Sequence, residues 1–262
     1  MTLDIAARYD FAIELAREAG ALASGARRSR TTLQAKAPMD YATQADHDVE
    51  ALIRRRIADR FGDAVIGEEA GGAPADLVWL VDPIDGTVNY IHGTARWCIS
   101  IGLLLAGQPE IGVIHAPDQD RLFSGRRGHG AFLNGAPISV SHLRHGASPV
   151  VETGWSARVR LAGYVDLITR LVDDGIEFRR HGSGALGLAD VACGQNDGYL
   201  EAHINSWDVL AGMVLVREAG GWINPFLDDD GLIRGNQIVA CTPEISDRLM
   251  LAMGASEEVS GP

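Results

Sequence analysis

The residues best suited to chemistry in this sequence form the run Asp82-Pro83-Ile84-Asp85-Gly86-Thr87. It follows an apolar segment over 77–81 that predicts a buried strand. Pro83 and Gly86 allow the sharp turn that would bring the two carboxylates to one point, and backbone N–H groups beyond Gly86 could meet an oxyanion if a helical turn begins there. Carboxylates beside an anion site need a cation between them, and this combination indicates Mg²⁺. The run could also be only a turn closed by Asx caps.

Acidic residues elsewhere could complete such a site, and each also has a purely structural interpretation. Glu68 and Glu69 follow a predicted strand, where adjacent acids repel each other unless a cation is near, although a solvated loop edge is the commoner outcome. Asp208 precedes an apolar helical pattern and could be its N-cap. Thr43-x-x-Asp46 matches a capping box before another helical pattern, and spacing alone favours capping there.

Hydrophobic periodicity indicates which elements must position these residues. A helix is expected over 5–22, weakened by glycine at its end, and a second over 49–61, followed by short apolar runs over 65–133 that read as strands of an antiparallel sheet. Beyond these, strands are expected at 150–151, 176–179, 199–200 and 238–241, and helices at 161–172, 184–193, 208–219 and 243–253. Such alternation is typical of an α/β layer.

The fold class is therefore α/β, built from two packed halves. Residues 1–140 are expected to form an α+β half that carries most of the metal ligands, and residues 141–262 an α/β half that completes the active site. A length of 262 residues suits one such body better than two independent domains.

Composition and charge exclude several classes of function. Hydrophobic residues make up 46% of the chain and the net charge is −12, so we expect a folded protein that contacts neither nucleic acid nor an anionic membrane directly. The N-terminus lacks signal-peptide order, and the longest apolar run, 98–106, is too short to cross a bilayer, which favours a cytoplasmic location. Cys98, Cys193 and Cys241 form no C-x-x-C pair and are expected to be buried free thiols.

Several motifs occur in an order that carries a family resemblance. They are Glu68-Glu69, the run 82–87 with Asn89-Tyr90, Gly128-x-Gly130-Ala131-Phe132-x-Asn134-Gly135, and Trp207-Asp208-x-x-Ala211-Gly212 with Glu218-Ala219-Gly220-Gly221. In these motifs the chain resembles the inositol monophosphatase family from about residue 7 to residue 242. The resemblance implies a layered αβαβα sandwich of the sugar phosphatase type, usually a homodimer. It also implies Mg²⁺-assisted hydrolysis of a small phosphate monoester with Li⁺ as inhibitor.

The resemblance also implies a set of metal ligands, for two to three Mg²⁺ ions in each active site. Glu68, Asp82 and the carbonyl of Ile84 would hold one ion, and Asp82, Asp85 and Asp208 a second. Glu68 would hold a weaker third ion through water and so belongs to the catalytic group. This arrangement fits the chemistry, because two Mg²⁺ ions can neutralise a phosphate monoester and stabilise its leaving alkoxide.

Further roles follow from the same resemblance. Asp46 and Thr87 would orient the attacking water, and Glu201 would accept hydrogen bonds from ring hydroxyls, which supports a polyol substrate. Gly184 departs from the alanine that is more usual at its position. The implied substrate contacts are Asp85, Gly86, Thr87, Gly182, Ser183 and Glu201.

The expected function is hydrolysis of a small polyol phosphate, with inositol-1-phosphate as the first choice. Histidinol phosphate and fructose-1,6-bisphosphate are alternatives on the same scaffold. An alternative of another class is a protein-binding regulator of RNA transcription complexes, a role that some members of the family have.

Overall fold

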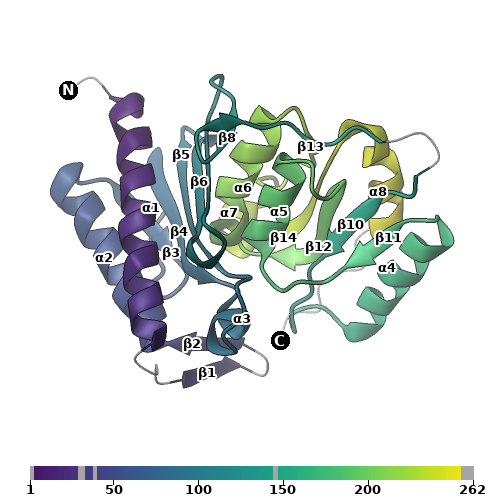
Figure 1. Ribbon diagram of the computed structural model, residues 1–262, viewed down its shortest axis with the longest axis horizontal. Coiled ribbons are helices and arrows are strands. Elements are labelled where there is room, and N and C mark those ends of the chain that lie inside the picture. The colour runs from purple at the N-terminus through teal and green to yellow at the C-terminus, as the bar shows by residue number, and fades with distance from the viewer. Residues whose placement is uncertain (1–2, 29–32, 38–39, 144–146, 255–262) are drawn as a thin grey trace.

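Five alternating layers of helices and sheets make up this chain (Figure 1). The computed structural model describes residues 3–28, 33–37, 40–143 and 147–254. The helices are α1 (Ile5–Arg28), α2 (Gln44–Arg60), α3 (Thr87–Ile91), α4 (Leu161–Asp173), α5 (Gly184–Ala192), α6 (Ser206–Glu218), α7 (Gly231–Arg234) and α8 (Ser246–Met253). In the described ranges no helix combines the length and apolarity needed to cross a bilayer.

The first sheet has seven strands in the order β3-β4-β5-β6-β7-β8-β9. They are β3 (Ala64–Gly67), β4 (Leu77–Asp85), β5 (Cys98–Leu105), β6 (Gln108–Ala116), β7 (Arg121–Arg126), β8 (Ala131–Leu133) and β9 (Ala136–Pro137). All neighbours pair antiparallel, as expected, except β3 and β4, which are parallel. A separate hairpin joins β1 (Leu33–Ala37) to β2 (Asp40–Thr43).

The second sheet has five strands in the order β11-β10-β12-β14-β13. They are β10 (Val150–Thr153), β11 (Glu177–Arg179), β12 (Gly198–Ile204), β13 (Trp222–Ile223) and β14 (Asn236–Cys241). Strand β10 pairs parallel with β11 and β12, whereas β14 pairs antiparallel with β12 and β13. The expected boundary near residue 140 falls in the connection between the last strand of the first sheet and the first strand of the second.

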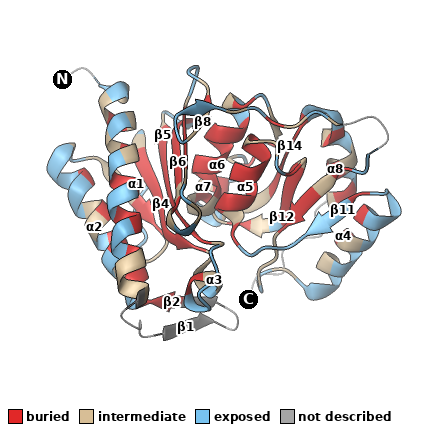
Figure 2. Cartoon of the chain, viewed as in Figure 1, coloured by how far each residue is buried: buried red, intermediate tan, exposed pale blue. Residues whose placement is uncertain are grey.

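Four clusters of buried apolar residues pack between the layers in the described part of the chain. Helices α1 and α2 cover one face of the first sheet, α5 and α6 lie between the two sheets, and α4 and α8 cover the outer face of the second (Figure 1). Figure 2 shows that burial is greatest in the central helices and in the strands that flank them. This is the αβαβα sandwich that the resemblance implied.

The sequence predicted most of these elements, and the differences have physical causes. Helix α1 runs on to Arg28 instead of ending at residue 22, and Gly20, expected to weaken its end, is a packing residue. A Cβ there would lie 2.5 Å from the His115 ring, so only glycine lets α1 approach the end of β6. The expected helix over 243–253 is split into a 3₁₀ turn at Pro243–Ile245 and α8. One cysteine differs from expectation: Cys193 is only half-buried, whereas Cys98 and Cys241 are buried.

The glycine-rich motif around residue 128 holds the central helix in place. The Glu218 carboxylate, at the end of α6, accepts hydrogen bonds from the backbone N–H groups of Gly128, His129 and Gly130 at 2.8, 3.1 and 2.7 Å. These two motifs therefore contribute to structure, by fastening the β7–β8 turn to α6.

The two halves meet most closely where α6 crosses the first sheet. A Cβ on Gly112 of β6 would lie 2.2 Å from the Ala211 carbonyl oxygen, which is backbone and cannot turn away. A Cβ on Gly102 of β5 would lie 2.9 Å from the Leu210 side chain. Helix α6 therefore rests on a strip of bare backbone.

Replacing Gly112 tests this contact. We expect Gly112→Ala to lower the free energy of unfolding by about 3 kcal/mol, because the added methyl group must push α6 off the sheet. The matched control is Gly163→Ala in α4, where a Cβ meets nothing within 4 Å; it should leave stability unchanged or raise it by up to about 1 kcal/mol. Urea denaturation measures both, and equal stabilities of the two variants would contradict the account.

Candidate active site

The acidic run begins inside strand β4 and is shaped by a bulge. Asp82 lies opposite Ser100 of β5 and Asp85 lies opposite Cys98, so β4 carries one more residue than its partner between these pairs. Residues three apart in a regular strand point to opposite faces, and one extra residue brings both carboxylates to the same side. The expected Asx turn is also present, because the Ile84 N–H donates to Asp82 at 2.9 Å.

Three carboxylates from separate segments converge at the end of β4. Glu68 follows β3, Asp82 lies in β4, and Asp208 lies in the first turn of α6; one oxygen of each lies within 4.8 Å of the others. Burial is the main cause of the raised pKa values of Asp82 and Asp208, and repulsion from neighbouring carboxylates raises them further. A divalent cation would remove that repulsion, and carboxylate oxygens are the ligands that Mg²⁺ prefers. The donor set therefore fits the expected metal.

Two carboxylates of the site also cap helices. Asp46 accepts hydrogen bonds from the Thr43 N–H at 2.7 Å and from the Thr43 hydroxyl at 2.6 Å, which completes the capping box that the sequence predicted. Asp208 accepts the Asn205 N–H at 3.1 Å in the same way. Because each carboxylate has two oxygens, capping and a role in the site are compatible.

Thr87 lies within reach of Asp46. Its hydroxyl donates to the Ile84 carbonyl at 3.1 Å and lies 3.5 Å from Asp46 Oδ1. Gly86, just before it, has a φ of +89° and a Cβ there would lie 2.8 Å from the Arg96 carbonyl, so the turn into α3 requires glycine. The structure thus brings together the three residues expected to orient water or ligate metal at this turn.

Asp85 lies outside the three-carboxylate cluster and joins the two halves of the molecule. Its carboxylate accepts hydrogen bonds from the Ser183 hydroxyl and from the N–H groups of Ala185 at 2.8 Å and Gly184 at 3.3 Å, all at the start of α5. Burial raises the pKa of Asp85, and these hydrogen bonds oppose the rise. Ser183 is buried against Asp85, so any influence of its hydroxyl on a ligand passes through that carboxylate.

Cys98 lies beside the same carboxylate. Burial, together with the nearby Asp85, raises the pKa of the Cys98 thiol well above its ordinary value. A thiol held in this way is protonated and is a poor nucleophile. Cys98 is therefore unsuited to act as a nucleophile in this site.

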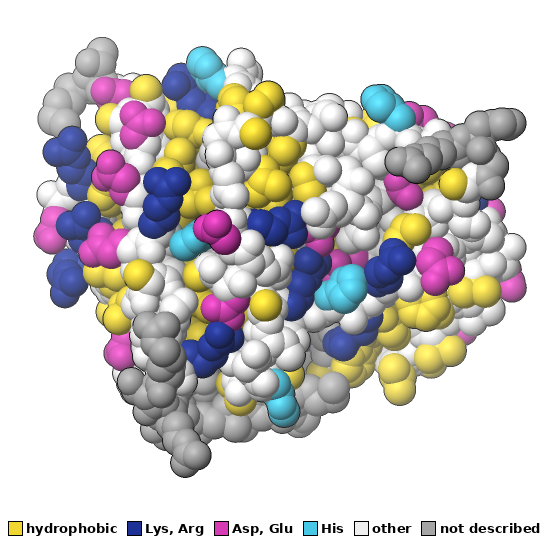
Figure 3. Space-filling view, in the orientation of Figure 1, with side chains coloured by type: hydrophobic (Ala, Val, Ile, Leu, Met, Phe, Trp, Pro, Cys, Tyr) yellow, Lys and Arg dark blue, Asp and Glu magenta, His cyan; other side chains and the backbone are white. Residues whose placement is uncertain are grey.

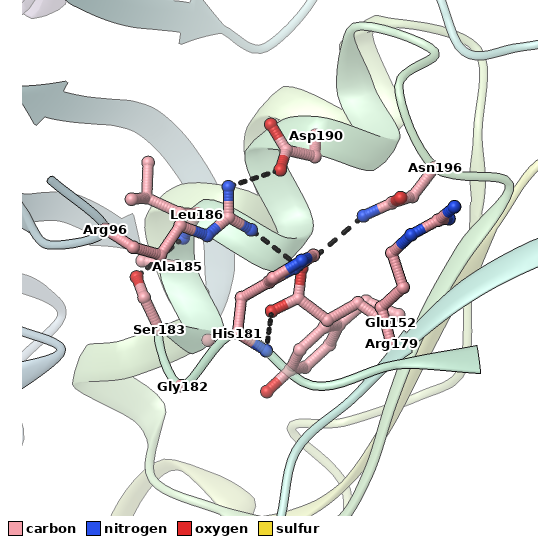
Figure 4. A network of polar contacts seen from close by, with 12 residues as sticks. Arg96, Glu152, Arg179, His181, Gly182, Ser183, Ala185, Leu186, Asp190 and Asn196 are labelled. Atoms are coloured by element: carbon pink, nitrogen blue, oxygen red, sulfur yellow. Dashed lines mark hydrogen bonds and ion pairs between the residues drawn. The ribbon is translucent and has the colours of Figure 1, made fainter. Parts of the chain in front are cut away.

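A network of ion pairs supports the turn over 181–183 (Figure 4). Arg96 pairs with Glu152 at 2.7 Å and with Asp190 at 2.5 Å. The Glu152 carboxylate in turn lies 3.0 Å from the His181 ring, and the Asn89 side chain donates to the His181 carbonyl at 2.8 Å. These contacts link β5, β10 and α5 and so fix the turn that meets Asp85. Figure 3 shows basic side chains and a histidine gathered over the same junction.

Glu201 occupies the wall of the site contributed by β12. The pKa of Glu201 is raised to about 7, chiefly by burial and also by the nearby Asp85, while the Tyr199 hydroxyl, Arg180 and Arg158 act to lower it. A carboxylate in this state accepts hydrogen bonds at neutral pH only while its neighbours support its charge.

Glu50 is a residue of the site that the sequence did not reveal. Its buried carboxylate accepts hydrogen bonds from the N–H groups of Glu69 at 2.7 Å and Ala70 at 3.1 Å and from Arg54 at 2.7 Å. A Cβ on Gly67 would lie 2.5 Å from this carboxylate, so the turn rests directly on it. Helix α2 therefore holds the turn that carries Glu68. The available signal was its position one helical turn after Asp46, on the same face of α2.

Replacing Glu50 tests this support. We expect Glu50→Gln to weaken Mg²⁺ binding, measured by isothermal titration calorimetry, by about 10-fold or more, because the new amide faces two N–H groups and releases the turn. The control Glu18→Gln makes the same chemical change at an exposed ion pair with Arg56 of α2 (3.2 Å). Unchanged binding in Glu50→Gln, or an equal loss in the control, would contradict this role.

Comparison with known proteins shows which family this chain resembles. A sequence model of the inositol monophosphatase family matches residues 4–253. A curated relative from Xylella fastidiosa, named Nus factor SuhB, is 40% identical over 222 residues, which are 78% of this chain and 80% of that protein. The solved structure of extragenic suppressor protein suhB from Bartonella henselae has a TM-score of 0.87 and 30% identity, and covers 96% of this chain and 100% of its own. That of inositol monophosphatase from Anabaena (Nostoc) has a TM-score of 0.81 and 33% identity, and covers 96% of each chain.

Proposed function

This chain belongs to the inositol monophosphatase family, and we propose that it is a Mg²⁺-dependent phosphomonoesterase that hydrolyses a small polyol phosphate, inositol-1-phosphate first among them. The observation that carries the proposal is the convergence of Glu68, Asp82 and Asp208 within 4.8 Å of one another. Buried carboxylates so close together need a divalent cation, and a cation beside an ester phosphate supplies the charge that hydrolysis requires.

The proposed roles of the residues follow from their positions. Glu68, Asp82, Asp208, Asp85 and the Ile84 carbonyl hold two to three Mg²⁺ ions. When bound, these ions supply positive charge that neutralises the phosphate, acidifies water and stabilises the leaving alkoxide.

A water molecule is oriented by Thr87 and Asp46 in this mechanism. The Thr87 oxygen accepts a hydrogen bond from the water, and its own hydrogen turns from the Ile84 carbonyl, 3.1 Å away, to Asp46 Oδ1, 3.5 Å away. The water lone pair then points at phosphorus, with no covalent intermediate on the protein. Hydrogen bonds of catalytic groups are often this long before substrate binds and shorten in its complex.

The substrate class rests on Glu201. Its carboxylate lies close enough to Asp85 to feel that charge, and it can accept hydrogen bonds from hydroxyl groups. Gly182, Ser183, Gly86 and Thr87 stay predicted contacts of the substrate. A homodimer, a cytoplasmic location and inhibition by Li⁺ also stay predictions of the resemblance.

Phosphate release tests the proposal. With Mg²⁺ we expect the chain to release phosphate from inositol-1-phosphate faster than from histidinol phosphate or fructose-1,6-bisphosphate. Removing Mg²⁺ with EDTA should abolish release, and Asp82→Asn should lower kcat/KM by about 100-fold or more because it removes a charge that holds the ions. Faster release from histidinol phosphate than from inositol-1-phosphate would make histidinol phosphate the assigned substrate. Release that EDTA leaves unchanged would refute the metal mechanism.

The relatives favour a second function. Curated proteins from Xylella fastidiosa and Escherichia coli that resemble this chain carry the name Nus factor SuhB, which fits the regulator of transcription complexes that the sequence left open. This name sits against the expectation of no nucleic-acid partner, which the net charge of −12 supports. Asp82→Asn separates the two functions in cells: a cellular function that this variant abolishes points to catalysis, and one that persists in the variant points to binding.

A further inference from the structure

Tyr199 and Glu201 form a buried pair on one face of β12. The two residues are two positions apart in a strand, so their side chains lie on the same face of the sheet. The Tyr199 hydroxyl donates to Glu201 Oε2 at 2.7 Å, and the two side chains are only 2% and 7% exposed. Within the described part of the chain, this is the one hydrogen bond that the Glu201 carboxylate receives, so its other oxygen is left for a ligand.

Bare backbone encloses this pair on two sides. A Cβ on Gly154 would lie 1.9 Å from Glu201 Oε2 and 2.5 Å from the Tyr199 oxygen, and a Cβ on Gly187 would lie 2.3 Å from the Tyr199 ring. At Gly184 a Cβ would lie 3.1 Å from the same oxygen. Gly154, just after β10, and Gly184 and Gly187 of α5 therefore form a slot around the Tyr199 ring. The slot directs the Tyr199 hydroxyl toward Glu201.

Without the Tyr199 hydroxyl, the Glu201 carboxylate could turn into a neighbouring cavity. A cavity of about 30 Å³ adjoins Glu201 and is lined also by Trp155, Tyr164 and Leu167. This is room for about one water molecule. The Tyr199 hydrogen bond therefore decides whether the carboxylate faces the site or turns into the cavity.

Electrostatics support the direction of this hydrogen bond. Burial, together with Glu201, raises the pKa of Tyr199 well above its ordinary value, so the phenol keeps its proton and acts as the donor. Donation in turn favours the charged, accepting form of Glu201, in the same sense as Arg180 and Arg158 and against the effect of Asp85.

We propose that Tyr199 positions the Glu201 carboxylate to accept a substrate hydroxyl, and so determines the preference for polyol phosphates over phosphate esters that lack hydroxyl groups. The inference rests on the proposed phosphatase function and deepens it. A site built to accept a hydroxyl rejects a ligand without one, because its own polar group is left unpaired. Tyr199 touches no substrate and acts through Glu201, so it is a positioning residue.

Tyr199→Phe is the direct test, because it keeps the ring in its slot and removes only the hydroxyl. We expect KM for inositol-1-phosphate to rise about 5- to 10-fold with little change in kcat, while both constants for phenyl phosphate stay within about twofold of wild type. The control Tyr9→Phe also removes a hydroxyl that makes a hydrogen bond, in this case to Ser124 at 2.9 Å. It should leave kcat and KM unchanged for both substrates.

A double variant shows whether the effect passes through Glu201. In a Glu201→Gln background we expect Tyr199→Phe to cause no further rise in KM, since the carboxylate it positions is gone. Equal losses on both substrates, or a full additional loss in the Glu201→Gln background, would overturn the inference.

The wild-type protein tests the proposed function separately. If it shows no preference for inositol-1-phosphate over phenyl phosphate, the polyol assignment fails, and the inference about Tyr199 fails with it. If the preference exists and Tyr199→Phe retains it, only the inference fails. Should Tyr199→Phe not fold, Gly187→Ala is the second variant, because its methyl group would lie 2.3 Å from the Tyr199 ring and would displace the hydroxyl, so it should produce the same selective loss.

Discussion

Repulsion among buried carboxylates is the constraint on which the rest of this structure depends. Glu68, Asp82 and Asp208 approach within 4.8 Å, with Asp82 buried and the other two half-buried, so their like charges cost more than they would in water. The fold must hold them together against that repulsion until a cation neutralises it. The first sheet contributes Glu68 and Asp82, and α6 contributes Asp208, so the site exists only when α6 is seated on the first sheet.

The same polar groups serve both folding and chemistry. Asp46 and Asp208 cap the helices that carry them, which fixes each carboxylate within the first turn of a rigid element. Asp85 binds the start of α5, and Glu50 binds the turn that bears Glu68. Each buried acid is therefore held by backbone N–H groups, so its position depends little on the mobility of its own side chain.

The sequence predicted the layered fold and the acidic cluster because both are written in local patterns: apolar periodicity, the run 82–87 and the capping signal at Asp46. It did not reveal Glu50 or Tyr199, because their roles come from contacts with turns and strands distant in sequence. It ended the first helix too early, at residue 22, since a glycine that permits close packing, such as Gly20, looks like one that weakens a helix. It also placed Cys193 in the core, because neighbouring apolar residues do not show which side of a helix end faces solvent.

Anomalous X-ray scattering from crystals soaked in Mn²⁺, a substitute for Mg²⁺, tests the central claim most directly. The account predicts two strong peaks, one within about 2.0–2.6 Å of carboxylate oxygens of Glu68 and Asp82 and one equally near those of Asp82 and Asp208, both absent in Asp82→Asn crystals soaked in the same way. A peak elsewhere, or no peak while these oxygens stay close together, would contradict it.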